Sequence, residues 1–144
     1  MSSKDYSTAL RTGIYTVLNG NVTVSSKTYK IYKDPVGGEP NRTYVAIGTI
    51  IDNEDGTKED FVFRGSISVE TIDESQTMNP TRDLSEAVNN KVRSLLKTTK
   101  SSTFTVIGST LTVFRHGGST RMREELKDKR MRYRIIDIYE FIIE

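Results

Sequence analysis

The sequence contains no cysteine among its 144 residues. A disulfide framework is therefore impossible, and a zinc site built on thiolate ligands is excluded. The fold must be held together by core packing, which suits a reducing cytoplasm. At this length we expect one domain, residues 1–144, large enough to bury about two-thirds of the surface that its unfolded chain exposes.

Long apolar runs are missing as well. None approaches the roughly 20 residues that span a bilayer, and the opening residues MSSKDYSTAL lack the apolar core of a signal peptide. Charged residues make up 28% of the chain, a fraction that is usual for globular proteins. We therefore expect a soluble domain without a membrane segment.

Residues for the common catalytic sites are scarce. The single histidine, His116, stands beside Gly117 and Gly118 and has no obvious partner for triad or metal chemistry. Neither a nucleophile elbow nor a P-loop occurs, and GGSTR (117–121) lacks the following helix of an anion cradle. The sequence therefore predicts no enzyme, no catalytic residue, no cofactor and no metal ion.

Hydrophobic periodicity predicts two helices. Residues 5–20, DYSTALRTGIYTVLNG, repeat apolar side chains at helical spacing and end on a glycine that can stop a helix. Residues 78–100, MNPTRDLSEAVNNKVRSLLKTTK, open with capping residues and a proline and then carry an apolar stripe.

The other segments have the alternation of strands. This pattern predicts one strand in each of four segments, residues 42–51, 61–73, 103–115 and 131–144. It predicts one extended strand or a loose hairpin in residues 21–34. The last strand is apolar on both faces, so it belongs in the middle of the sheet. The order α-β-β-β-α-β-β predicts an α+β fold: an antiparallel sheet of about four to five strands with two helices packed on one face.

Charge is unevenly distributed, although the net charge is only +2. Residues 34–86 contain twelve acidic and four basic residues, whereas residues 115–134 contain eight basic and three acidic ones. Such asymmetry fits a molecule that meets a charged partner, or copies of itself, through complementary potentials. Two solvated loops would produce the same pattern.

Two segments concentrate this charge. Residues 52–60, DNEDGTKED, predict a solvated hairpin tip with an Asp-Gly turn, because the strand flanks and the missing twelfth-position glutamate exclude an EF-hand. Residues 115–131 predict a long charged loop between the last two strands. Their bases could follow a phosphate backbone, but no aromatic residue between Arg115 and Arg132 could stack on bases. A small nucleic-acid-binding α+β module is therefore the weaker interpretation.

The order of these elements and the pattern of residues within them resemble those of tailed-bacteriophage tail terminators, also called tail completion or head–tail joining proteins. The resemblance is one of pattern and covers most of the chain. It runs through the segments TALRTGIYTVLNG, RTYVAIG, DFVFRGSISV, LSEAVNNKVRSLL and YRIIDIYEFII. The charged connection at 115–131 departs from the family pattern.

In such proteins several copies, commonly six, form a ring that caps the tail tube, ends its growth and offers a docking surface to the head. The resemblance therefore implies a homo-oligomeric ring in the tail or neck of a virion, assembled in the host cytoplasm. The implied partners are the tail tube protein and a head-completion or neck protein, while DNA passes through the lumen without specific binding. Another neck or head-completion ring protein would fit the same pattern.

The charged segments supply the predicted contacts. We expect residues 119–130, STRMREELKDKR, to project from the sheet and to meet an acidic face, either segment 52–60 of a neighbouring subunit or the tube protein; arginines here could also face DNA in the lumen. The predicted subunit, tube or lumen contacts are Arg121, Arg123, Lys127, Lys129 and Arg130 together with Asp52, Glu54, Asp55, Glu59 and Asp60.

Overall fold

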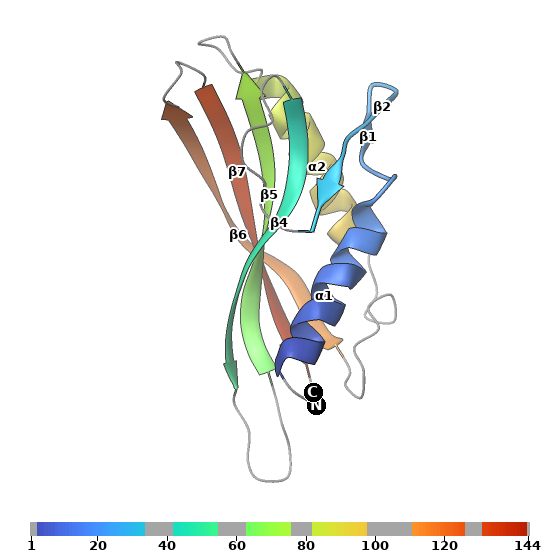
Figure 1. The fold of residues 1–144 in the computed structure, drawn as a ribbon, viewed down its shortest axis with the longest axis vertical. Helices are drawn as coiled ribbons and strands as arrows, with labels where there is room; N and C mark the ends of the chain where they lie inside the picture. The colour runs from blue at the N-terminus through green and yellow to red at the C-terminus, as the bar shows by residue number, and fades with distance from the viewer. Residues whose placement is uncertain are drawn as a thin grey trace.

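The computed structural model describes residues 3–33, 42–54, 63–75, 82–97, 111–125 and 131–143. They form two helices, α1 (Ser3–Leu18) and α2 (Arg82–Lys97), and several strands (Figure 1). The strands are β1 (Thr23–Val24), β2 (Lys27–Thr28), β3 (Ile31–Tyr32), β4 (Arg42–Glu54), β5 (Phe63–Ser75), β6 (Leu111–Glu125) and β7 (Met131–Ile143).

Five of these strands form one sheet in the order β3-β4-β5-β7-β6. The four long strands pair antiparallel, and the short strand β3 pairs parallel with β4. Strands β1 and β2 form a separate hairpin, in which Ser25 and Ser26 both have positive φ, as two-residue hairpin turns often require. The predicted α+β class is confirmed, with the sheet mixed at its β3 edge.

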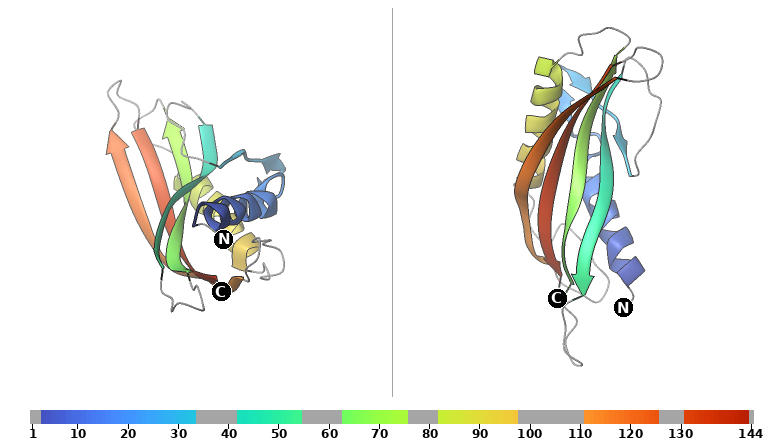
Figure 2. Two further views of the ribbon diagram at one scale, coloured as in Figure 1. Left: turned by 60° about the horizontal axis from the view of Figure 1, so that its bottom comes forward. Right: turned by 90° about the vertical axis from the view of Figure 1, so that its left-hand side faces the viewer.

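Both helices cover the same face of the sheet, as predicted (Figure 1, Figure 2). One apolar side chain per turn of each helix points into a shared core, because residues three and four apart lie on one helix face. The sheet contributes alternate residues of its central strands. The core includes Leu10, Ile14 and Leu18 of α1, Val88, Val92 and Leu96 of α2, and Val45, Ile47, Ile67, Val69, Tyr139 and Phe141 of the sheet.

Strand β7 lies between β5 and β6, which confirms its predicted central position. Its odd-numbered residues from Met131 to Phe141 are buried on the helix face, and the even-numbered residues on the other face are half-buried. We call this second side of the sheet, which carries no helix in the described chain, the open face. One buried face and one half-buried face explain why β7 carries apolar side chains on both sides.

The predicted loop over residues 115–131 is wrong for residues 115–125. These residues continue β6, and they pair with β7 from Arg115↔Glu140 to Glu125↔Met131. The sequence hid this strand because most of its side chains are exposed, so it needs no apolar alternation. Residues 119–125 therefore do not project from the sheet, and residues 126–130 lie outside the described part of the chain.

A β-bulge in β4 depends on Gly48. The pairing register between β4 and β5 shifts between Ile47 and Ile50, and at this shift the amide of Thr49 donates a hydrogen bond to Ser68 Oγ at 3.0 Å. A Cβ atom on Gly48 would lie 2.1 Å from the same Oγ. A larger residue would therefore break the hydrogen bond that holds the bulge.

We expect Gly48→Ala to lower the free energy of unfolding by about 1–3 kcal/mol, because the methyl group overpacks the bulge and displaces Ser68. Urea denaturation measures the change. Gly118→Ala is the matched control, since no atom lies within 4 Å of its added Cβ and its cost should be small. Equal stability of both variants would contradict the assignment.

Candidate functional site

The outer side of β6 is the longest open edge among the described strands. β6 has 15 residues, pairs with β7 on one side only, and leaves its other backbone edge without a partner in the described ranges. Most of its side chains are exposed, including Met122 at 41%. Because an unpaired edge can add a strand from another chain, β6 is the first candidate for an interaction surface.

Arg121, a predicted contact residue, is engaged within its own chain. Its Nε and Nη2 atoms donate hydrogen bonds to the two carboxylate oxygens of Glu86 in α2, at 2.6 and 2.9 Å. These hydrogen bonds lower the pKa of Glu86, although partial burial works in the opposite direction. Arg121 therefore ties the edge strand to the helix layer. Its guanidinium is not a free anchor.

Arg123 lies two residues further along the same side of β6, opposite Tyr133. Its side chain is exposed, and no hydrogen bond or ion pair joins it to another described residue. Of the predicted basic contacts that the structure describes, Arg123 is thus the one available to a partner. Lys127, Lys129 and Arg130 lie outside the described residues.

The predicted acidic contacts begin at the far end of β4. The backbones of Asp52 and Glu54 pair with Gly65 and Phe63 of β5, while Asp55, Glu59 and Asp60 fall outside the described residues. β4 and β6 are separated by β5 and β7, so Asp52 and Glu54 lie on a strand near one edge of the sheet while Arg121 and Arg123 lie on the strand at the other edge.

Several arginines of the basic segment are neutralised on the open face. Arg115 pairs with Glu140 at 2.8 Å, Arg132 with Glu74 at 2.8 Å, and Arg134 with both Glu70 and Glu124. Among the basic residues of 115–134 that the structure describes, all but Arg123 are therefore paired with glutamates. This balance weakens the electrostatic case for a phosphate-binding surface.

A buried carboxylate, Asp137, joins β7 to α2 and β6. Its oxygens accept hydrogen bonds from Asn89 Nδ2 at 2.5 Å and Arg93 Nη2 at 2.9 Å, and lie 3.1 Å from His116 Nε2. The side chain of Asp137 has no exposed surface. His116 thus has a carboxylate partner that the sequence did not reveal, because Asp137 lies on a separate strand, 21 positions away.

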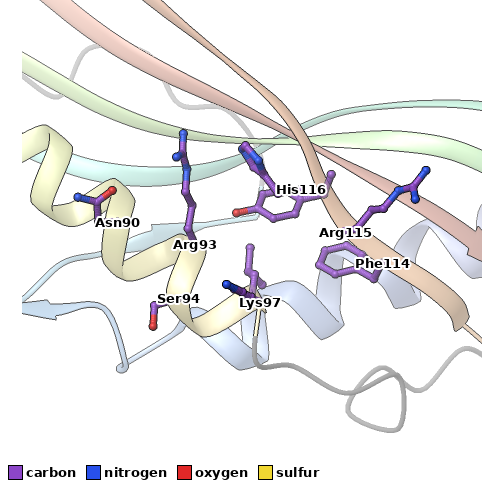
Figure 3. A pocket seen from close by; sticks show the side chains of 9 residues that line it. Asn90, Arg93, Ser94, Lys97, Phe114, Arg115 and His116 are labelled. Carbon is purple, nitrogen blue, oxygen red and sulfur yellow. The ribbon is translucent and has the colours of Figure 1, made fainter.

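A histidine–carboxylate pair is also part of serine-hydrolase sites, so its surroundings bear on catalysis. Ser94 of α2 lines the same pocket as His116 (Figure 3). Within the described residues, however, no hydroxyl is hydrogen-bonded to His116, and Asp137 is shared with Arg93 and Asn89. Among those residues there is also no group of three potential metal ligands. This geometry suits a structural role in which Asp137 holds β6 and α2 against β7.

A pocket of about 750 Å³ opens between the C-terminal half of α2 and the first half of β6 (Figure 3). Phe114 stacks on Tyr139 with ring centres 5.3 Å apart, and His116 meets the same ring edge-on at 5.4 Å. Its remaining walls come mainly from α2, with Asn90, Arg93, Ser94, Leu96 and Lys97, and from Arg115 of β6. The sequence did not predict this pocket, because its residues come from three separate elements.

Tyr139 has an unusual position in this pocket. The residue is 2% exposed, and its hydroxyl is buried without a hydrogen-bond partner in the described structure. Burial raises the pKa of Tyr139, and the negative charge of Asp137 raises it further. The hydroxyl therefore keeps its proton and remains a donor that lacks an acceptor.

No protein-family profile and no curated protein sequence match this chain. A solved structure does match: a chain described as "Virion of native gene transfer agent (GTA) particle", with a TM-score of 0.67 and 15% sequence identity. The match covers 97% of this chain and 99% of the other, so the two chains share one fold over nearly their whole length.

Neither helix in the described residues is long and apolar enough to cross a membrane.

We expect Tyr139→Phe to raise the free energy of unfolding by about 1 kcal/mol, because it removes a buried hydroxyl that makes no hydrogen bond. Tyr44→Phe is the matched control. The Tyr44 hydroxyl donates to Glu74 at 3.2 Å in a buried site, so its loss should cost about 1 kcal/mol. A loss of stability in Tyr139→Phe, measured by thermal denaturation at concentrations where the chain is monomeric, would mean that its hydroxyl has a partner within its own chain.

The Arg121–Glu86 pair predicts a pH dependence. The pKa of Glu86 in the fold lies below its ordinary 4.5, so the pair stabilises the protein above pH 4.5 and this contribution disappears as the pH falls through the lowered value. We expect Arg121→Gln to cost less than about 1 kcal/mol at pH 7, since both side chains are partly exposed. Urea titrations from pH 7 to pH 3 should show the two proteins converging; a constant difference would contradict the assignment.

Proposed function

We propose that this protein is a structural component of a phage-type virion and that its copies form a ring which ends and completes the tail. The fold match to a chain of a gene transfer agent particle, which extends over nearly all of both chains, supports the virion role. The resemblance of its element order to tail terminators supports the more specific position at the end of the tail tube.

The observation that supports the ring is that, among the described strands, the sheet has two unlike edges that lack a full-length partner strand. A closed ring of identical subunits needs two different surfaces that fit each other, because each subunit meets one neighbour with the first surface and another with the second. Here β6 offers one edge. β4 offers the other, since β3 covers it only at Val45 and Ala46.

Exposed apolar side chains mark both edges. Ile51 on β4 is 67% exposed and Met122 on β6 is 41% exposed, and these are the large exposed hydrophobic residues of the described chain. Single exposed apolar residues are common on monomers, but here one lies on β6 and the other on the part of β4 that β3 does not pair with. Their burial would favour association of the two edges.

The open face of the sheet suits a surface that DNA can pass. Its arginines are held by glutamates at Arg115–Glu140, Arg132–Glu74 and Arg134–Glu70. Phosphate binding requires unpaired cations, whose contacts release counterions from the DNA. A face of paired charges should therefore bind DNA only weakly. The ring would then join tail to head through contacts with the tube protein and a neck protein, without chemistry.

We expect the purified chain to form a discrete oligomer in light scattering at several concentrations, with a mass that short duplex DNA does not change at physiological salt. Ile51→Lys and Met122→Lys should each reduce the oligomer at least tenfold in association constant, because a lysine would have to be buried at an edge contact. Thr12→Lys, at an exposed position of α1, is the matched control.

Two results would contradict the proposal. One is a chain that stays monomeric at all concentrations and also in the presence of tail tubes. The other is a monomer that binds DNA with an affinity that falls steeply as salt rises, which would favour a nucleic-acid-binding module.

A further inference from the structure

One of the cationic side chains around the pocket between α2 and β6 is not paired with an anion of the described chain. Arg93 is paired with Asp137 and Arg115 with Glu140, whereas the exposed Lys97 has no ion pair with any described residue. The side chains of these cations border the same cavity (Figure 3). The surroundings of the pocket therefore carry a net positive charge of one, which fits a ligand with a carboxylate group.

A second observation points to an acceptor group. Tyr139 lines this pocket, and its hydroxyl is a buried donor without a partner among the described residues. A buried donor of this kind destabilises the fold unless an acceptor reaches it. A carboxylate oxygen is a strong acceptor for a neutral hydroxyl, and it would also lie near Lys97.

The pairing registers show where such a carboxylate could come from. One row of paired residues crosses the four long strands from β6 to β4 and consists of Arg115, Glu140, Ser66 and Ile51. The next row holds Phe114, Phe141, Gly65 and Asp52. The pocket is thus level with the point where β4 enters the acidic segment 52–60, at the opposite edge of the same sheet.

The same registers place Arg121 and Arg123 in other rows of the sheet than Asp52. Arg121 and Arg123 are level with Val45 and Thr43 at the other end of β4, far along the strand from Asp52. Two copies placed edge to edge in the same register would therefore bring the acidic segment of one to the pocket of the other. They would not bring it to the two arginines.

We propose that this pocket receives the acidic segment 52–60 of a second copy, with one of its carboxylates bound by the Tyr139 hydroxyl and Lys97. The inference rests on the ring proposed above and names one contact within it. The segment contains five acidic residues and one lysine, so its charge complements that of the pocket. The pocket and the segment are different surfaces of one chain, as closure of a ring requires.

The absence of cysteine allows a direct test by cross-linking. We expect mild oxidation of a mixture of Lys97→Cys and Asp55→Cys chains to give a heterodimer on a denaturing gel, at least fivefold above a mixture of Lys30→Cys and Asp55→Cys. Lys30 is an exposed lysine that precedes β3, away from the pocket. Adding Tyr139→Phe to the Lys97→Cys chain should lower the yield several-fold, while thermal denaturation confirms that this variant is folded.

The outcomes separate this inference from the ring itself. If the oligomer forms but the Lys97→Cys mixture gives no more product than the control mixture, the ring stands and the pocket contact is overturned. If the chain stays monomeric, a labelled peptide of residues 50–62 tests the pocket alone. Peptide binding that Tyr139→Phe weakens about tenfold supports the pocket, and binding no tighter than that of the same peptide with amides in place of its carboxylates overturns it.

Discussion

The arrangement of α2 on the sheet depends on one buried charge, Asp137. A carboxylate without exposed surface is stable only if donors surround it, and here Asn89 and Arg93 come from α2 while His116 comes from β6. The same carboxylate therefore fixes the helix against β7 and holds the start of the edge strand beside the helix. The pocket exists because these three elements are kept at this distance. Arg121 and Glu86 repeat the connection between β6 and α2 further along the strand.

The second constraint is the need of backbone groups for hydrogen bonds. An open sheet has two outer strands whose outward N–H and C=O groups must meet water or another chain. In this fold the two edges differ, because β3 covers only a short part of β4 while β6 is open along its described length. Unlike edges favour a head-to-tail contact over a symmetric one, and repeated head-to-tail contacts generate rings or filaments. The proposed virion ring uses this property of the sheet and needs no catalytic group.

Elements with one buried side could be predicted from the sequence, and elements without one could not. The apolar stripe of α2 and the double-sided apolar pattern of β7 follow from burial, so both helices and the central strand were predicted in their places. The second half of β6 was missed because an exposed edge strand imposes no alternation on its side chains. The pairing of Arg121 with Glu86 and of His116 with Asp137 joins residues 35 and 21 positions apart. No local pattern records such contacts. The resemblance of the element order to tail terminators is the source of the proposed virion role, while the comparison of structures shows a fold shared with a chain of a gene transfer agent particle.

The one-sided attachment of β6 has a consequence for local stability. A strand bonded to a single neighbour can open without breaking the rest of a sheet, so its amides exchange with solvent through small local fluctuations while those of β5 and β7 require larger ones. The part of the molecule that would meet a neighbour is therefore also the part that can adjust its shape at little cost to the core. The same subunit could then form rings of different curvature, free or bound to a tube, because β6 adjusts while the helices and the rest of the sheet stay rigid.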